Sequence, residues 1–155
     1  MDKKVLIING PNINMLGTRE KGVYGAVSYE DMCATLMRMA KDLKITLEIF
    51  QSNHEGALVD KIQGSRATAD LIIINPGAYT HTSIALRDAL AAVRVPFIEV
   101  HISNIYAREE FRHKSFLSDI AAGLIAGFGV EGYYFALEAA NRVISRGEEE
   151  PGAKR

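Results

Sequence analysis

The sequence predicts an α/β fold in which a parallel β-sheet carries helices on both faces. Short apolar runs of strand length recur along the chain, and segments with helical periodicity separate them. Most of these runs are almost continuously apolar, which is typical of parallel strands whose two faces are both covered. Strands that alternate with helices in this way indicate a single parallel sheet joined by crossover helices.

Five segments are expected to form the strands. Four of them are apolar runs at residues 5–9, 46–50, 71–75 and 97–101. The first, third and fourth are the most continuously hydrophobic, so we expect them to be covered on both faces. A fifth strand is expected at residues 123–128, although the glycines there disfavour extended structure.

Four helices are expected after the first, second, third and fifth strands. Ser28, followed by Asp31, resembles a capping box at the start of the first helix, and Pro96 follows the end of the third. The positions that mark the four helices are Met32, Leu36, Met39 and Leu43; Leu58, Ile62 and Ala69; Leu86, Leu90 and Val93; and Val130, Tyr134, Leu137, Asn141 and Ile144.

The length of 155 residues suits one domain. These elements favour a three-layer, doubly wound, flavodoxin-like sheet of five parallel strands in the order 2-1-3-4-5. Residues 1–146 would form this domain, and the charged residues 147–155 would form a disordered tail. Such sheets bind ligands beyond the carboxyl ends of their strands, where the strand order reverses. We therefore look for function at that edge.

The composition argues against several classes of partner. The net charge of −1 provides no basic field for nucleic acid or for an anionic membrane. The apolar run after Lys4 is too short for a signal peptide or a membrane span. The single cysteine, Cys33, cannot form an intrachain disulfide and fits a cytoplasmic location. No His or Cys grouping has zinc spacing, and no glycine-rich phosphate loop follows the first strand.

Polar side chains gather at three predicted strand ends. The first strand runs into Asn9 and Asn12, the third into Asn75, and the fourth into His101 and Ser103. Asn and Ser are also common in turns and helix caps, so any one of them is ambiguous. Their presence at three strand ends that meet at one edge favours a binding crevice.

The segment between the first strand and the first helix is long for its type. It spans residues 10–27, whereas βα loops commonly have about 2–6 residues and long ones often act as lids or binding loops. It contains Arg19 and Tyr24, which a curled loop would bring together. A nearby guanidinium favours the phenolate form of tyrosine, which would make Tyr24 a base for a proton next to a carbonyl. The alternative is a solvated arginine and a tyrosine packed on the surface.

A complementary acid is available at the end of the fourth strand. Glu99 precedes His101 by two residues and therefore points to the same face of the sheet. Its carboxylate would orient the imidazole of His101, which could protonate a departing hydroxyl group. His101 could instead be a strand-end histidine that bonds only to the backbone, but its pairing with Glu99 favours the functional interpretation.

Three long motifs, in this order, resemble the type II 3-dehydroquinate dehydratases over nearly the full chain. The first is INGPNINMLGTRE at residues 8–20, continued by VYG at residues 23–25. The second is INPGAYTHTS at residues 74–83, which continues to Arg87 and Asp88. The third is EVHISNIYAREEFRH at residues 99–113. Together these motifs are specific to the family.

The resemblance implies a catalytic role for each of five residues. Tyr24 would remove the proton from the carbon next to the substrate ketone, and Arg19 would keep Tyr24 ionised and stabilise the transition state. Asn12 would stabilise the enolate through a water molecule. His101, oriented by Glu99, would protonate the leaving hydroxyl. The elimination would be anti, and the family needs no metal or cofactor.

The resemblance also implies binding roles and an assembly. Ile102 and Ser103 would hold the substrate carboxylate, while Arg108 would help to close the lid. Asp88 would reach the site of a neighbouring subunit in a dodecamer built as a tetramer of trimers. The residues that would hold the ring hydroxyls and the carboxylate end are Asn75, His81 and Arg112.

Three other functions fit the sequence less well. A receiver domain needs acidic residues at the ends of the first and third strands, but Asn9, Asn12 and Asn75 stand there. A flavin-binding module is distinguished by experiment, because the purified protein would be yellow. An inactive scaffold is disfavoured because Arg19, Tyr24 and His101 are all present. The unrelated type I dehydratases form an imine with lysine, but no lysine stands at these strand ends.

Overall fold

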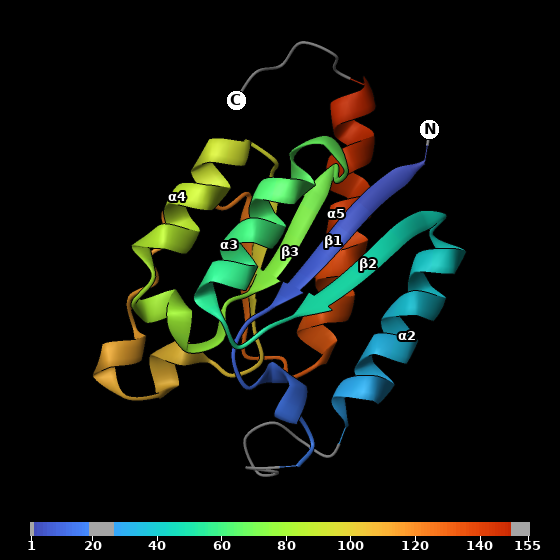
Figure 1. The fold of residues 1–155 in the computed structure, drawn as a ribbon. Coiled ribbons are helices and arrows are strands. Elements are labelled where there is room, and N and C mark those ends of the chain that lie inside the picture. Colours follow the sequence, from blue (N-terminus) through green and yellow to red (C-terminus); the bar gives the residue numbers. More distant parts are fainter. Residues whose placement is uncertain (1, 19–26, 150–155) are drawn as a thin grey trace.

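The computed structural model describes residues 2–18 and 27–149. Its centre is a sheet of five parallel strands in the order β2-β1-β3-β4-β5, which confirms the predicted order (Figure 1). The strands are β1 (Lys3–Asn9), β2 (Ile45–Gln51), β3 (Leu71–Asn75), β4 (Phe97–His101) and β5 (Gly123–Ala126).

The predicted strand boundaries are closest where the sequence changes abruptly from apolar to polar. The predictions for β3 and β4 match at both ends. The strands β1 and β2 each begin earlier than expected, because Lys3 of β1 already pairs with Ile45 of β2. The prediction for β5 was too long by two residues: the strand ends at Ala126, and Gly127 leaves it with φ of +95°.

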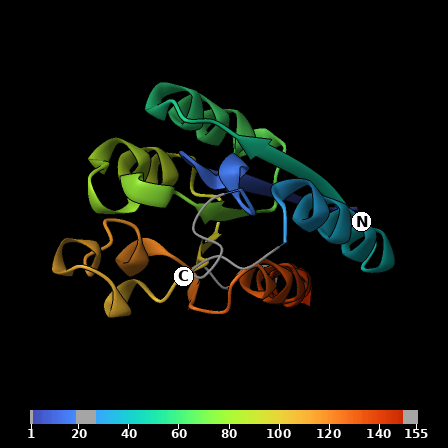
Figure 2. The same cartoon turned by 90° about the horizontal axis from the view of Figure 1, so that it is seen from below.

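In the described part of the chain, four α-helices cover the sheet in two layers. They are α2 (Tyr29–Asp42), α3 (Glu55–Gly64), α4 (Ile84–Val93) and α5 (Glu131–Glu149). Helices α3 and α4 lie on one face of the sheet and α2 and α5 on the other, as the end-on view makes clear (Figure 2). The predicted cap of α2 is confirmed, since the Ser28 side chain accepts a hydrogen bond from the backbone N–H of Asp31 at 3.1 Å.

Each face of the sheet has its own hydrophobic core. Alternate residues of β1 point to opposite faces, as in any strand. Val5 and Ile7 pack in the core beneath α2 and α5, whereas Leu6 and Ile8 pack in the core beneath α3 and α4. All four side chains are almost completely buried. Strand β1 is therefore fixed from both sides, and so is the position of its carboxyl end.

The C-terminal helix differs from the prediction in its buried face and in its length. The face that packs on the sheet consists of Gly132, Tyr133, Ala136, Leu137 and Ala140. Of the expected stripe only Leu137 is fully buried, whereas Val130, Tyr134 and Ile144 lie at its margin. We expected a disordered tail from residue 147, but α5 continues to Glu149, and residues 150–155 lie outside the described part of the chain.

Short 3₁₀ helices surround the carboxyl edge of the sheet. They include η1 (Ile13–Met15) after β1, η3 (Gly77–His81) after β3, and η4 (Ile105–Ala107), η5 (Glu110–Arg112) and η6 (Ser118–Ile120) after β4. Because α4 begins only at Ile84, His81 lies in η3 and does not share a helix with Asp88. Within residues 2–18 and 27–149, none of the helices combines the length and hydropathy of a membrane-spanning segment.

Candidate active site

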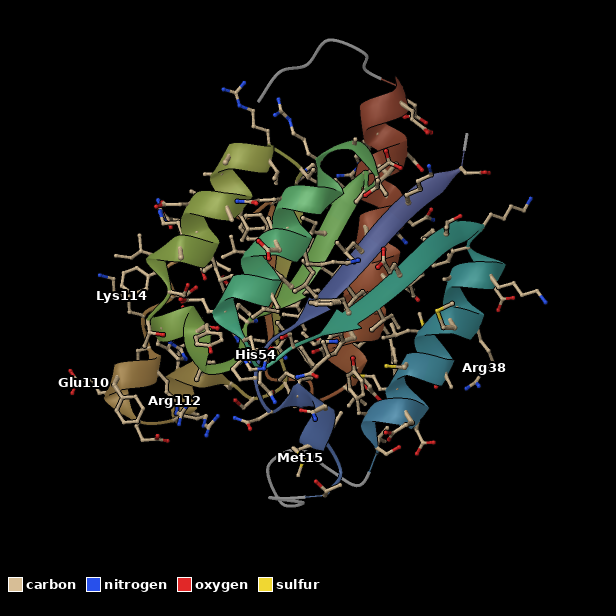
Figure 3. The ribbon with its side chains drawn as sticks, in the orientation of Figure 1. Met15, Arg38, His54, Glu110, Arg112 and Lys114 are labelled. Carbon is tan, nitrogen blue, oxygen red and sulfur yellow. The ribbon has the colours of Figure 1, made fainter. Side chains whose placement is uncertain are left out.

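A pocket of about 210 Å³ opens at the carboxyl ends of β1, β3 and β4. This is the edge at which the strand order reverses, since β1 pairs with β2 on one side and with β3 on the other. Figure 3 shows Met15 and Arg112, which both line the pocket, at the end of the molecule to which the strand arrows point. Eight predicted site residues line it: Asn12, Asn75, His81, His101, Ile102, Ser103, Arg108 and Arg112.

Among the predicted site residues that the structure describes, two do not line this pocket. Glu99 lies directly behind it and contacts His101. Asp88 is exposed on α4, away from the pocket lining, so its predicted role at a neighbouring subunit stays a prediction. Arg19 and Tyr24 lie outside the described residues.

His101 and Glu99 form a buried pair. Nε2 of His101 lies 2.5 Å from Oε2 of Glu99, and the glutamate has no exposed surface. A carboxylate accepts hydrogen bonds, so Nε2 carries the hydrogen of this contact. The expected proximity of the two side chains is thereby observed, and Nδ1 is the ring nitrogen that remains for a ligand.

Two serines that the sequence did not single out hold Glu99 in place. The Ser115 hydroxyl donates to Oε1 at 2.9 Å, and the Ser118 hydroxyl lies 3.1 Å from Oε1 and 3.0 Å from Oε2. Ser115 also accepts the backbone N–H groups of Leu117 and Ser118, which directs its one hydroxyl hydrogen to the carboxylate. A buried carboxylate needs such partners, because an unpaired one is costly.

Asn75 is held from two sides at the end of β3. Its Oδ1 accepts the backbone N–H of Gly77 at 3.1 Å, and its Nδ2 donates to the Tyr133 hydroxyl at 2.9 Å. The same hydroxyl donates to Oδ1 of Asn9 at 2.6 Å. The sequence did not single out Tyr133 as a site residue, and no local pattern marks it, because its contacts come from distant strands.

The residues that directly follow β1 are held by hydrogen bonds to residues near the carboxyl ends of β3 and β2. The backbone N–H of Gly10 donates to the carbonyl of Asn75 at 2.8 Å, and a Cβ at Gly10 would lie 2.3 Å from the carbonyl oxygen of Pro76. Glycine is therefore required at this crossing. Asn12 follows in the left-handed region with φ of 69°, which asparagine tolerates, and its N–H donates to Oδ1 of Asn53. This conformation leaves Asn12 in the pocket wall.

His81 faces the pocket from η3 as a hydrogen-bond acceptor. Its Nδ1 lies 2.8 Å from the carbonyl oxygen of Lys114, so Nδ1 carries the hydrogen. Burial lowers the pKa of His81 below its ordinary value, which favours the neutral ring. Nε2 of a neutral ring with this tautomer accepts a hydrogen bond, which suits a substrate hydroxyl.

Two guanidinium groups give the opposite wall a positive charge. Nε of Arg112 donates to Oε2 of Glu109 at 2.9 Å, and this contact holds the pKa of Glu109 below its ordinary value. Arg108 lies 3.9 Å from the same carboxylate and 3.5 Å from the Ser103 hydroxyl. Arginine suits a carboxylate ligand because its planar N–H groups match the two oxygens.

The arrangement can bind a polar anion and transfer protons to it. A fixed histidine–glutamate pair, an amide, a neutral histidine and two arginines converge on one cavity. In the described part of the chain, no three His, Cys, Asp or Glu side chains are grouped as a metal ion would require.

Comparisons with known proteins agree with this chemistry. The family model described as dehydroquinase class II matches residues 3–141. A 3-dehydroquinate dehydratase from Endomicrobium trichonymphae is 61% identical over 135 residues, which cover 87% of this chain and 94% of that protein. A catabolic 3-dehydroquinase from Aspergillus clavatus is 57% identical over 138 residues, 89% of this chain and 92% of that protein.

Solved structures share the fold as well as the sequence. The type II dehydroquinase of Butyrivibrio crossotus superimposes with a TM-score of 0.88 at 50% identity and covers 90% of this chain and 98% of its own. That of Propionibacterium acnes gives 0.87 at 41% identity, with 92% and 98% covered. The chain belongs to the class II dehydroquinase family.

Proposed function

We infer that this chain is a 3-dehydroquinate dehydratase, a hydro-lyase that removes water from 3-dehydroquinate to give 3-dehydroshikimate. The observation that carries the inference is the buried His101–Glu99 pair, which faces a pocket walled by amide and guanidinium groups. The substrate is a hydroxylated ring with a ketone and a carboxylate, and these walls offer partners for each of its polar groups. The reaction would serve the shikimate pathway or quinate breakdown, and one of the relatives is named a catabolic 3-dehydroquinase.

We propose that the reaction is an anti elimination through an enolate. Tyr24 takes the proton from the carbon next to the ketone, and the electron pair of that C–H bond moves into the enolate. Arg19 keeps Tyr24 ionised, and Asn12 stabilises the enolate oxygen through a water molecule. The enolate then collapses, the C–O bond breaks, and His101 gives its proton to the departing hydroxyl, which leaves as water.

His101 is well placed to give up that proton. Its Nε2 is held by Glu99, which restrains the ring and leaves Nδ1 as the nitrogen available to a ligand. Glu99 also stabilises the protonated ring, much as a carboxylate orients histidine in other acid–base pairs. After each turnover the proton on Tyr24 must return to His101, either directly or through solvent, to restore the starting state.

Substrate binding is proposed to use the remaining pocket residues. Ile102 and Ser103 bind the carboxylate at the end of β4, next to Arg112. Asn75 and His81 bind ring hydroxyls. Arg108 closes over the bound substrate.

The direct test is to mix the purified protein with 3-dehydroquinate and follow the conjugated enone product by ultraviolet absorbance. We expect absorbance to grow without any added metal or cofactor, and a flat trace would sink the proposal. Tyr24→Phe should lose most turnover but still bind substrate. Tyr106→Phe is a matched control, because Tyr106 is 58% exposed and does not line the pocket. Full activity in Tyr24→Phe would remove Tyr24 from the mechanism.

We further propose a homododecamer, a tetramer of trimers, in which Asp88 contributes to a neighbouring site. Ile84, one turn before Asp88 on α4, is 56% exposed, and an exposed apolar side chain next to a functional carboxylate suits a subunit contact. Phe128 and Phe135, whose rings meet edge to face at 5.6 Å, are also exposed. Light scattering should give twelve times 17.0 kDa, about 204 kDa, and a monomer mass would refute the assembly. A cytoplasmic location, supported by the single cysteine, completes the proposal.

A further inference from the structure

Tyr133 lies beneath the pocket and connects its floor to the C-terminal helix. Its side chain is completely buried, and its hydroxyl bridges Asn9 and Asn75 at 2.6 Å and 2.9 Å. These asparagines end β1 and β3 and are paired with each other in the sheet. The hydroxyl therefore joins the two strand ends at which the strand order reverses. Burial raises the pKa of Tyr133 far above its ordinary value, so the hydroxyl keeps its hydrogen.

The hydrogen bonds in this group can run in only one direction. The backbone N–H of Gly77 can only donate, so the Asn75 atom 3.1 Å from it is the carbonyl oxygen. The amide nitrogen of Asn75 then faces Tyr133, whose oxygen must accept. The single hydroxyl hydrogen of Tyr133 is left for Oδ1 of Asn9, whose own nitrogen donates to the Tyr29 hydroxyl at 3.3 Å.

The Gly77 end of this chain is fixed by the backbone. Gly77 has φ of +60°, and a Cβ there would lie 2.9 Å from the carbonyl oxygen of Pro11. The backbone of Asn75 is fixed as well, because its carbonyl accepts the N–H of Gly10. Neither end of the Asn75 side chain is therefore free to exchange its oxygen and nitrogen.

We propose that Tyr133 is a positioning residue that holds the amide nitrogen of Asn75 in the pocket wall, while the backbone N–H of Gly77 fixes the amide oxygen. The Asn75 nitrogen has two hydrogens, and one of them is used by Tyr133. The second is the donor that Asn75, which lines the pocket, offers to a substrate oxygen. This inference rests on the proposed function and deepens it: the oxygen bound at Asn75 must act as an acceptor.

The test uses Tyr133→Phe, which removes a single oxygen atom. We expect KM for 3-dehydroquinate to rise about tenfold, the change that goes with losing one well-placed hydrogen bond. The value of kcat should stay within about twofold, because this contact is made equally in the ground state and the transition state. A merely structural role would lower kcat through loss of folded enzyme and leave KM unchanged. Tyr134→Phe, at the neighbouring half-buried position, is the matched control and should change neither constant.

A double-mutant cycle shows whether Tyr133 acts through Asn75. In an Asn75→Ala background, Tyr133→Phe should cause no further rise in KM. A second rise of about tenfold would mean that Tyr133 acts by another route and would overturn the proposal. An unchanged KM in the single Tyr133→Phe variant would overturn it too.

A second variant covers the case in which Tyr133→Phe does not fold. Asn9→Ala leaves Tyr133 in place but removes the acceptor of its hydroxyl hydrogen, which frees that hydrogen to turn toward Asn75. A raised KM with kcat retained supports the proposal, and an unchanged KM overturns it. Wild-type protein that does not turn over 3-dehydroquinate would instead refute the proposed function, so the two failures are distinguishable.

Discussion

Replacing Ser115 by alanine should destabilise the protein about twice as much as replacing Ser118. The Ser115 hydroxyl donates to Glu99 and accepts two backbone N–H groups, those of Leu117 and Ser118, at 3.0 Å and 3.2 Å. The Ser118 hydroxyl shares its one hydrogen between the two oxygens of Glu99. A hydrogen bond to a carboxylate contributes about 1.5–3 kcal/mol and a neutral one about 0.5–1.5 kcal/mol. We therefore expect losses of about 3 kcal/mol for Ser115→Ala and about 1.5 kcal/mol for Ser118→Ala.

Thermal unfolding followed by circular dichroism measures both losses. For a domain of this size, 1 kcal/mol shifts the melting temperature by roughly 2–4 °C, so the expected shifts are about 6–12 °C and about 3–6 °C. Ser52→Ala is the control, because Ser52 caps only the exposed N–H of His54, and it should stay within about 0.5 kcal/mol of wild type. Equal shifts for the two variants, or a larger one for Ser118→Ala, would refute this reading of the hydrogen bonds around Glu99.

Three further predictions concern the backbone, the core and the response to alkali. Gly77→Ala should lower the free energy of unfolding in urea by about 2 kcal/mol, because φ is +60° and the new Cβ meets the carbonyl of Pro11. A variant as stable as wild type would contradict this. In the same assay, Leu137→Ala should lower the free energy of unfolding by about 3 kcal/mol. Glu138→Ala, at the next and exposed position, should lower it by less than about 0.5 kcal/mol. Similar losses for the two variants would reject the assigned face of α5. Burial raises the pKa of Tyr29 from 10.0 to about 12, so the folded state keeps a proton that the unfolded chain releases. The stability of the folded state is therefore unaffected by the titration of Tyr29 below about pH 10, and it falls as the pH rises from about 10 toward about 12. Melting temperatures over that interval should fall less steeply for Tyr29→Phe than for wild type, and equal slopes would disprove the assignment.

The sheet was predictable because its strands carry their own signals. In β3, an uninterrupted apolar run lies between the polar residues Asp70 and Asn75; β4 begins directly after Pro96 and ends at His101, and both strands match the prediction residue for residue. The face of α5 was predicted wrongly because large residues define the expected stripe, whereas three small residues, Gly132, Ala136 and Ala140, belong to the observed face beside Tyr133 and Leu137. At Gly132 a Cβ would lie 3.5 Å from Ile125 and 3.6 Å from Val100, in ordinary van der Waals contact with both, so this position of the helix lies directly against the sheet.

The site was predictable where its partners are near in sequence. Glu99 and His101 are two residues apart on one strand, and alternation alone brings them to one face. The contacts of Ser115 and Ser118 with Glu99 cross 16 and 19 residues, and that between Tyr133 and Asn75 crosses 58. Such contacts depend on how the elements pack, so periodicity and spacing cannot indicate them.

The described walls of the pocket fix which groups a ligand must present before any ligand binds. The Asn75 amide is locked as a donor, and the neutral ring of His81 offers an acceptor. The guanidinium group of Arg112 is positively charged. Its hydrogen bond to Glu109 uses only some of its N–H donors. A ligand that satisfies all three presents an acceptor oxygen, a hydroxyl hydrogen and an anionic group within one small pocket. This is the pattern of a hydroxylated ring carboxylate, and it supports the proposed substrate independently of the proton transfers assigned to Tyr24 and His101.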